Sequence, residues 1–235
     1  MTLSTPKRLY LFVVGIMPEY NIPIVCYLLQ TADGRNILID SGLPAVMPEG
    51  ETDFENTTDV LQQLKALGFQ AADIDTVIST HYDIDHAGRH GSFTNARFIV
   101  QRAHHSAALA GDPRFAALRD QWEQPLERIQ LIEGDTEVLP GLQLIDTTGH
   151  VVGHQSVLLR LPKTGSLLLT IDAVSFADGF TRDLPAESDN PDAAAVHAST
   201  IKLMDIAEQQ HIGLVIFGHD VQQWSTLKTA PEYYE

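Results

Sequence analysis

Short runs of apolar residues, separated by turn-forming residues, predict β-strands at the start of the chain. The stretches RLYLFVVG (8–15), IPIVCYLLQT (22–31) and NILIDSG (36–42) are rich in β-branched and aromatic residues and are bounded by Gly, Pro or Asp. The tetrapeptide ADGR (32–35) has the composition of a hairpin turn. The polar segment 47–56 predicts a loop.

The next segment has the periodicity of a helix. In TTDVLQQLKALGF (57–69) the apolar residues fall at helical spacing and a glycine follows as a stop signal. These apolar residues are Val60, Leu61, Leu64 and Leu67. The run DIDTVIST (73–80) then predicts a strand that leads directly into a cluster of polar residues.

The second half of the chain repeats this order of strands and helices. RFIVQ (97–101) predicts a strand, and residues 103–129 predict mostly helix with a break near Asp112 and Pro113. The remaining predicted elements are strands at 136–140, 142–148, 154–162 and 166–172, a helix at 192–210 and a strand at 213–220. We therefore expect an α/β fold of the αββα sandwich type, with two mixed sheets and helices on the outer faces, as a single domain over residues 1–235.

Polar side chains follow the predicted strands where each strand ends. Four of them lie within six residues in STHYDIDH (79–86), directly after an apolar run. Three more stand singly after later strands. The seven residues are His81, Asp83, Asp85, His86, His150, Asp172 and His219. Because loops at one sheet edge converge, we expect these side chains to meet in one site.

Imidazole and carboxylate groups without thiolates suit Zn²⁺, Fe²⁺, Mn²⁺ or Co²⁺. Seven candidate ligands exceed the four of a tetrahedral zinc site, so two ions with one bridging carboxylate are expected. Such a pair would lower the pKa of a shared water toward neutrality. The pattern favours metal-assisted hydrolysis over a Ser-His-Asp mechanism, because the sequence contains no G-x-S-x-G motif.

The composition excludes some classes of partner. The chain carries 15 Lys and Arg against 31 Asp and Glu, a formal charge of −16, which argues against nucleic acid and anionic membranes. The single cysteine, Cys26, lies in an apolar run and is expected to be a buried, inert thiol. The N-terminal residues lack the pattern of a secretory signal or a membrane span, so we expect a cytoplasmic protein.

The segments STHYDIDHAG, TTGHVVGHQS, LTIDA and FGHD stand in the order and at the spacing typical of the metallo-β-lactamase superfamily, which the chain resembles from about residue 8 to its C-terminus. The stretches IPIVCYLLQT, GSFTNARFIVQR and IEGDTEVLPGLQL are most similar to the N-acyl homoserine lactone lactonases of that superfamily. The resemblance implies the metallo-β-lactamase fold and a quorum-quenching hydrolase that opens a lactone ring.

The resemblance also implies a role for each matching residue. One metal would be held by His81, His150 and Asp172. A second would be held by Asp85, His86 and His219, with Asp172 bridging the two ions. A metal-bridging hydroxide would attack the lactone carbonyl, and Asp85 would handle the proton, so that Asp85 and Asp172 are the catalytic carboxylates. The cofactors would be two divalent transition-metal ions, with zinc as the first expectation.

Two positions depart from the family's pattern. Asp83 stands where the motif has its second histidine, and a carboxylate ligand there would favour Fe or Mn over Zn. The alternatives are that Asp83 supports the ligands without binding metal, or that the first site is weakened. Ser175, followed by Phe176, stands where these lactonases carry a tyrosine that contacts the substrate carbonyl. We expect both residues at the substrate-binding site.

These departures leave other functions open. The substrate could be another lactone or ester, for example an aromatic lactone, or the chain could be a degenerate, non-catalytic member. The expected partner is a small-molecule lactone. The short N-terminal region fits either an open pocket or a homodimer surface.

Three further positions have expected roles near the ligands. Asp40 is either a buried support residue or a turn cap, and Asp220 is expected to orient His219. His154 is expected to pack near His150. The other histidines on predicted helices are expected to be solvated: His104, His105, His197 and His211.

Overall fold

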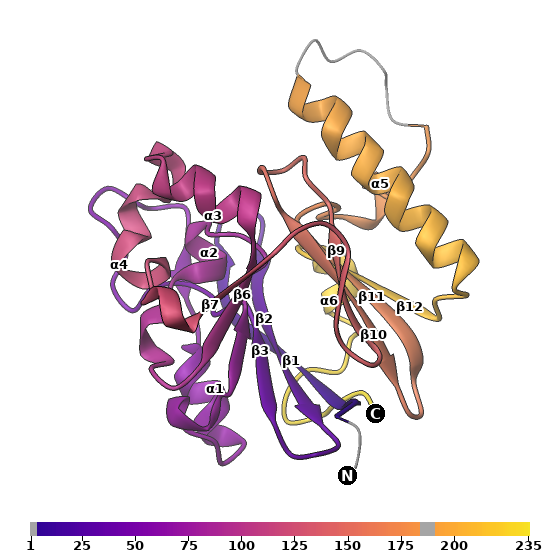
Figure 1. Ribbon diagram of the computed structural model, residues 1–235, viewed down its shortest axis with the longest axis horizontal. Coiled ribbons are helices and arrows are strands. Elements are labelled where there is room, and N and C mark those ends of the chain that lie inside the picture. The colour runs from indigo at the N-terminus through magenta and orange to yellow at the C-terminus, as the bar shows by residue number, and fades with distance from the viewer. Residues whose placement is uncertain (1–3, 184–190) are drawn as a thin grey trace.

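The computed structural model describes residues 4–183 and 191–235, and two β-sheets packed face to face form its centre (Figure 1). The first sheet has the strand order β4-β1-β2-β3-β5-β6-β7 and the second the order β12-β11-β10-β9-β8. The first sheet comprises β1 (Pro6–Met17), β2 (Ile22–Thr31), β3 (Asn36–Ile39), β4 (Glu55–Asn56), β5 (Thr76–Ile78), β6 (Arg97–Gln101) and β7 (Ile129–Ile132). The second comprises β8 (Thr136–Leu139), β9 (Leu142–Asp146), β10 (Gln155–Leu161), β11 (Gly165–Ile171) and β12 (Leu214–Phe217).

Helices cover the outer faces of both sheets (Figure 1). The first sheet is flanked by α1 (Val60–Ala66), α2 (Ile84–Ala87), α3 (Arg102–Leu109) and α4 (Arg119–Trp122). The second is covered by α5 (Pro191–Gln209), and α6 (Val221–Trp224) follows the last strand. Short 3-10 turns complete the order at Ala71–Asp73, His90–Ser92, Pro113–Leu118, Leu126–Arg128 and Ala177–Gly179. This confirms the predicted αββα sandwich, while the prediction of a single domain over 1–235 stays a prediction.

The central strands are apolar on both faces because both faces are covered. In β1, Leu9 and Leu11 pack between the two sheets, whereas Phe12 and Val14 face the helical layer that contains Leu64. A strand buried on both sides reads as a continuous apolar run rather than an alternating one. This explains why the first runs of the sequence were recognisable as strands without a clear period of two.

The predicted helical segment 103–129 differs from the structure. It contains α3, the 3-10 turn Pro113–Leu118, α4 and a second 3-10 turn, and strand β7 begins at Ile129. Strand β7 pairs in parallel with β6, with Phe98 opposite Ile129. The run IQLI is only four residues long, and periodicity cannot separate a strand of that length from the end of a helix. The predicted loop 47–56 likewise ends in β4, which pairs with β1.

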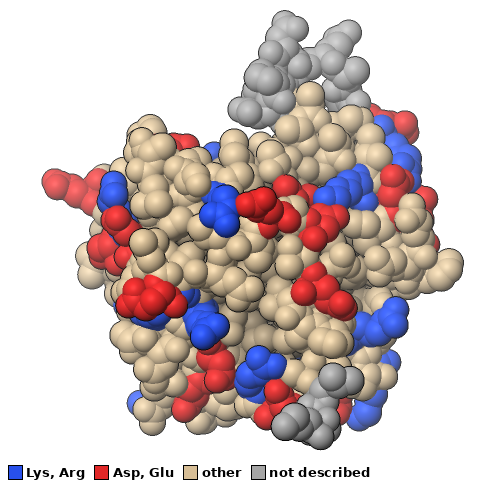
Figure 2. All heavy atoms as spheres, viewed as in Figure 1, with Lys and Arg blue, Asp and Glu red and all other residues tan. Residues whose placement is uncertain are grey.

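Acidic and basic side chains alternate on the face of the molecule viewed in Figure 1, without a continuous basic patch among the described residues there (Figure 2). Among the described residues, no helix combines the length and apolar character that crossing a bilayer requires. Cys26 is fully buried in β2, as expected, and burial raises the pKa of its thiol well above the usual value.

Candidate active site

Strand register places the polar side chains of the second sheet next to one another. Strands β11 and β12 run in parallel, with Leu169 opposite Ile216 and Ile171 opposite Phe217. A register shift follows Leu169, and Ile171 adopts a left-handed backbone with φ of 53°. The residues that follow these paired strand ends, Asp172 and His219, therefore emerge side by side at one edge of the sheet.

Parallel strand pairing also brings strand ends together in the first sheet. Strands β3 and β5 are parallel, with Ile39 opposite Ile78, so Asp40 lies beside the start of the STHYDIDH segment. Asp40 Oδ1 accepts a hydrogen bond of 2.8 Å from Thr80 N, and Oδ2 accepts one of 2.6 Å from Thr80 Oγ1. The chain then turns into α2, which carries Asp85 and His86 toward the second sheet.

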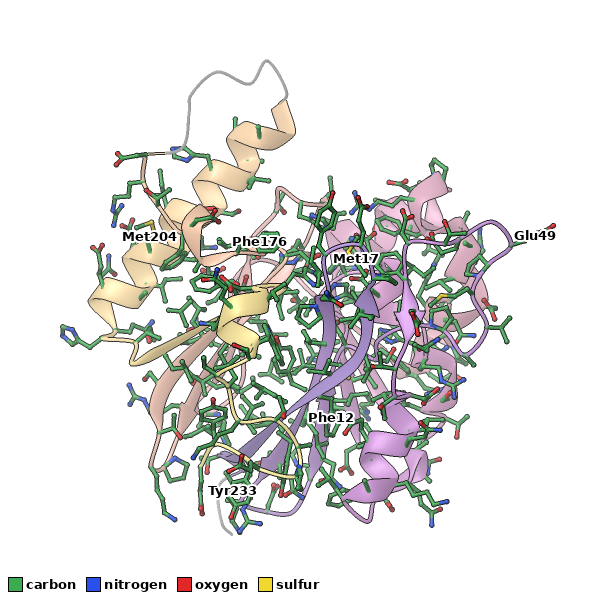
Figure 3. The ribbon with its side chains drawn as sticks, turned by 180° about the vertical axis from the view of Figure 1, so that it is seen from behind. Phe12, Met17, Glu49, Phe176, Met204 and Tyr233 are labelled. Atoms are coloured by element: carbon green, nitrogen blue, oxygen red, sulfur yellow. The ribbon has the colours of Figure 1, made fainter. Side chains whose placement is uncertain are left out.

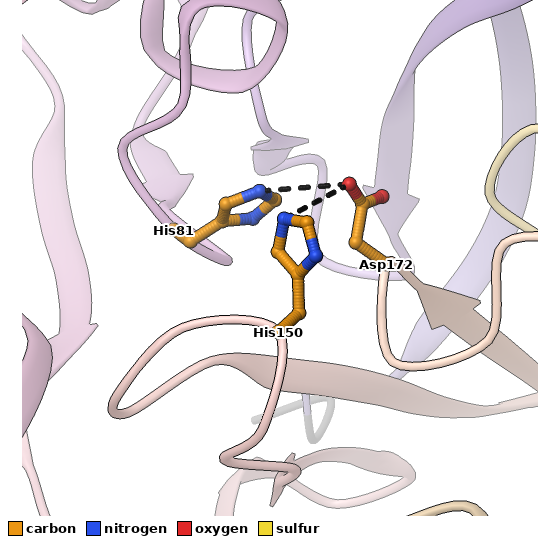
Figure 4. A group of neighbouring side chains, drawn as sticks. All are labelled: His81, His150 and Asp172. Atoms are coloured by element: carbon orange, nitrogen blue, oxygen red, sulfur yellow. Dashed lines mark ion pairs between the residues drawn. The ribbon is translucent and has the colours of Figure 1, made fainter. Parts of the chain in front are cut away.

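Six of the seven predicted ligands form two groups. One ligand atom from each of His81, His150 and Asp172 lies within 4.8 Å of the other two (Figure 4). Asp85, His86 and His219 form a second group by the same measure. Sequence positions up to 138 residues apart, from 81 to 219, are thus brought to one place.

The two oxygens of Asp172 face different groups. Oδ2 lies 3.7 Å from His81 Nε2 and 3.5 Å from His150 Nε2. Oδ1 lies 3.4 Å from His86 Nε2 and 3.1 Å from His219 Nε2. A carboxylate divided in this way between two groups has the geometry of a bridge.

The atoms at the centre of the site point at a common space rather than at one another. In the described part of the chain, His81 Nε2, His86 Nε2 and Asp172 Oδ1 are buried and make no hydrogen bond. Buried polar atoms normally have a partner. Ligand atoms around a tetrahedral zinc with bonds of about 2.0–2.1 Å lie about 3.3 Å apart, close to the spacing observed here. The donor set and its geometry therefore fit divalent metal ions.

Charge within the site agrees with this fit. Burial raises the pKa of Asp172, but the charges of His219 and His86 hold it well below its usual value. Burial lowers the pKa of His219, but the charge of Asp172, its contact with the ring and the charge of Asp85 raise it to about 9. Ionised carboxylates held in a buried site require cations nearby.

Two of the candidate ligand histidines, His86 and His219, are oriented through the ring nitrogen that faces away from the site. His86 Nδ1 lies 2.8 Å from Asp40 Oδ2, so Asp40 is the buried support residue and not a turn cap. His219 Nδ1 lies 2.9 Å from the carbonyl oxygen of Pro23. The prediction that Asp220 orients His219 is wrong, because Asp220 caps α6 and accepts hydrogen bonds from Gln223 N and Ala177 N.

His154 lies behind the site, as expected. It is fully buried, its ring centroid is 5.0 Å from that of His81 and 6.0 Å from that of His150, and its Nδ1 lies 2.8 Å from Thr147 Oγ1. Its Nε2 accepts a hydrogen bond of 3.3 Å from the backbone N–H of Asp172. His154 therefore fixes the backbone that presents Asp172.

The expectation that His104 and His105 are solvated is wrong. Both are buried in α3, and the ring of His104 packs 4.6 Å from that of Tyr82. His105 Nδ1 lies 3.0 Å from Tyr82 Oη. Burial lowers the pKa of His104 to about 4, so it is a neutral core residue at pH 7. His211, in contrast, is exposed.

Asp83 occupies a different environment from the other six residues. Its Oδ2 lies 3.2 Å from His81 Nε2 and 3.0 Å from His150 Nε2, but it belongs to neither group of three. Both of its oxygens contact the guanidinium of Arg114. Arg114 was not predicted as a site residue, because it carries no sequence signal that separates it from a surface arginine.

Ser175 and Phe176 lie beside His219. The carbonyl oxygen of Ser175 accepts a hydrogen bond of 2.9 Å from His219 N. Phe176 is 41% exposed and borders a 440 Å³ cavity together with Asp220 and Val221. Phe176 and Met17, at the end of β1, lie at the same end of the two sheets (Figure 3). Their role in substrate binding stays a prediction.

Asp40→Asn is expected to lower the affinity of the second group for Zn²⁺ by about 10–100-fold, the usual effect of losing the outer partner of a ligand histidine. Asparagine tolerates the left-handed φ of 57° at this position, so the backbone should hold. Metal content and chelator competition measure the effect. Asp59→Asn, at the N-cap of α1, is the matched control. Equal affinities in Asp40→Asn and wild type would contradict the orienting role.

The fold is that of a known class of proteins. Residues 21–219 match the family model described as the metallo-beta-lactamase superfamily. The chain belongs to the metallo-beta-lactamase superfamily. This confirms the resemblance noted in the motifs of the sequence.

Within the superfamily, the chain belongs to the family of the N-acyl homoserine lactonases. It is 35% identical over 230 residues to the N-acyl homoserine lactonase of Bacillus thuringiensis, covering 91% of this chain and 87% of that protein. It is also 35% identical over 240 residues to the N-acyl homoserine lactonase AttM of Rhizobium johnstonii, covering 92% of this chain and 89% of that protein.

A solved structure of an N-acyl homoserine lactone hydrolase, with the product N-hexanoyl-L-homoserine bound at its catalytic metal center, superposes with a TM-score of 0.83 at 30% identity. The superposition covers 98% of this chain and 100% of that chain. The dizinc quorum-quenching lactonase AidC, at 17% identity and a TM-score of 0.70 over 99% of this chain and 97% of that one, shares the fold.

Proposed function

We propose that this chain hydrolyses the lactone ring of N-acyl homoserine lactones, using two divalent transition-metal ions held by the two groups of ligands. The observation that carries the proposal is the division of the Asp172 carboxylate between the groups, with Oδ2 toward His81 and His150 and Oδ1 toward His86 and His219. Similarity to lactonases over most of the chain supports the choice of substrate.

The first ion would be held by His81, His150 and Asp172, and the second by Asp85, His86, His219 and Asp172. The chemistry that such ions supply is a lower pKa for a water and polarisation of the lactone carbonyl. Imidazole and carboxylate ligands fit zinc first, and the carboxylate of Asp83 beside the first group also admits iron or manganese.

Asp85 is the residue proposed to move the proton. Burial raises the pKa of its carboxyl, but the charge of His86 and its contact with the ring hold the pKa below the usual value, so the group is ionised at pH 7. It can accept the proton released by the attacking water and return it to the ring oxygen as the C–O bond breaks. A 440 Å³ cavity bordered by Asp85, Ile84 and Phe54 is the place proposed for the substrate.

A second candidate function, hydrolysis of an aromatic lactone or another ester, is favoured by one observation. The serine side chain at position 175 is shorter than the tyrosine expected there from the resemblance, so it offers no phenolic donor to a substrate carbonyl. Hydrogen-bond support of a developing oxyanion, worth about 3 kcal/mol for one donor, must then come from another group.

The homodimer and the cytoplasmic location remain predictions from the sequence.

Rates on a panel of lactones separate the two functions. The chain loaded with Zn²⁺ is expected to open N-hexanoyl-L-homoserine lactone with a kcat/KM at least about tenfold above that for an aryl lactone such as dihydrocoumarin. The rate of ring opening is measured from the protons that the reaction releases. Treatment with a chelator should abolish the activity, and added Zn²⁺ should restore it. Slow and equal rates on acyl chains of every length, with fast aryl lactone opening, would favour the second function instead.

A further inference from the structure

Arg114 reaches into the first group of ligands from a separate part of the fold. It lies in the 3-10 turn Pro113–Leu118, which Asp112 caps by accepting a hydrogen bond from Arg114 N. Its Nε lies 2.6 Å from Asp83 Oδ1, and its Nη2 contacts Asp83 Oδ2. The two side chains form a parallel, two-bond pair, which is the strongest arrangement that arginine and a carboxylate adopt.

The same guanidinium also touches a proposed ligand. Arg114 Nη2 lies 2.9 Å from His150 Nε2. A guanidinium can only donate, so in the tautomer that leaves Nε2 without a proton this contact uses the lone pair of Nε2, whereas Asp83 Oδ2, 3.0 Å from the same nitrogen, is served only by the N–H tautomer. That lone pair is the one that a metal ion would need. Arg114 and an ion in the first group therefore compete for one nitrogen, while the bond from Arg114 Nε to Asp83 Oδ1 can persist.

The pair also changes the charge of the site. The Asp83 side chain is 12% exposed and lies against two ligand histidines. Both oxygens of its carboxyl accept hydrogen bonds from the Arg114 guanidinium, a pairing that an ionised carboxylate makes. Asp83 is therefore anionic. Together with the cationic Arg114 it carries no net charge, as a neutral histidine in the same place would.

We infer that Asp83 and Arg114 act as one unit in place of a single histidine, and that Arg114 is a positioning residue that sets the metal affinity of the first group. The inference rests on the proposed function, because it assumes that this group holds a cation. Without Arg114, the full negative charge of Asp83 would face the ion and His150 Nε2 would be free. Without Asp83, an unpaired cation would stand beside the ion.

A double-mutant cycle on Zn²⁺ affinity tests this unit. Arg114→Gln is expected to bind the first Zn²⁺ about tenfold more tightly than wild type, and Asp83→Asn about tenfold more weakly, since one charge has been removed close to a divalent ion. The double variant, which restores neutrality, is expected to lie within about threefold of wild type. Competition with a chromophoric chelator gives the affinities, and elemental analysis gives the number of ions per chain.

Two further variants separate charge from general structure. Arg114→Lys keeps the charge but loses the two-bond pair with Asp83, so its Zn²⁺ affinity is expected to lie between those of wild type and Arg114→Gln. Arg119→Gln removes an exposed arginine paired with Glu123 nearby in the chain and should leave the affinity unchanged. Thermal unfolding checks that each variant is folded. Arg114→Gln binding Zn²⁺ as weakly as Asp83→Asn, or a double variant no better than the weaker single one, would overturn the inference.

The Zn²⁺ affinities test the role of Arg114, and the lactone assay tests the proposed function separately. A charge-dependent cycle in a chain that opens no lactone would count against the proposed function alone. If the chain hydrolyses lactones but Arg114→Gln and Asp83→Asn leave its Zn²⁺ affinity unchanged, only the role of Arg114 would be contradicted.

Discussion

Asp172→Asn is expected to lower kcat/KM for lactone hydrolysis by at least about 10³-fold, because loss of only an outer partner of a ligand usually costs about 10–100-fold and Asp172 faces both groups directly. The amide keeps the size of the side chain but removes the negative charge that lies 3.1 Å from His219 and 3.5 Å from His150. An amide also presents only one oxygen, so it cannot serve both groups.

The measurement pairs kinetics with metal content. Asp172→Asn should hold fewer than two ions per chain under conditions in which wild type is saturated. Asp120→Asn, an exposed carboxylate of α4, is the matched control and should retain full activity and metal. Retention of two tightly bound ions together with wild-type rates would remove the bridging role.

Gly88→Ala is expected to reduce the free energy of unfolding by about 3 kcal/mol or more, because overpacking against a rigid neighbour cannot relax. A Cβ at this position would lie 2.2 Å from Pro44 N, 2.3 Å from the carbonyl carbon of Leu43 and 2.6 Å from Gly42 O. These are backbone atoms, so no change of rotamer removes the clash. The loop that contains Gly42 would have to separate from α2.

Such a separation would also displace His86, a candidate ligand. The carbonyl oxygen of His86 accepts a hydrogen bond of 2.7 Å from Ser41 N, and Gly88 N donates one of 2.8 Å to Gly42 O. We therefore expect Gly88→Ala to lose Zn²⁺ affinity as well as stability. Denaturant unfolding measures the first effect. Gly179→Ala is the control, since its Cβ would meet only Val174 Cγ1 at 3.6 Å, and a loss in Gly88→Ala no larger than in this control would contradict the packing argument.

The meeting of the candidate ligands was predictable from sequence because each lies in a segment that follows a strand. An apolar run that ends in His or Asp places the polar group at a sheet edge, and the parallel pairing of β11 with β12 then fixes Asp172 beside His219. The strands themselves were recognisable from residue type and length. The roles of these residues remain proposals, but their meeting in one place follows from the pattern.

Other features could not be predicted from sequence, for identifiable physical reasons. The Pro23 carbonyl that orients His219 is a backbone group, and every residue has one. Arg114 lies 31 residues from Asp83, in a segment whose periodicity is interrupted by Pro113, so no spacing connects them. His104 lies on a helix face that is buried by aromatic side chains from elsewhere, including Tyr82 and Phe115.

The candidate ligands of each group come from both halves of the sandwich. His81 precedes α2 and follows a strand of the first sheet, whereas His150 and Asp172 belong to loops of the second. An ion at that position would cross-link the two sheets. In a chimera that combines one sheet of this chain with the other sheet of a distant homologue, the strand ends must therefore lie at the same level along the sandwich. The metal site thus limits which chimeras of this family can fold with a complete set of ligands.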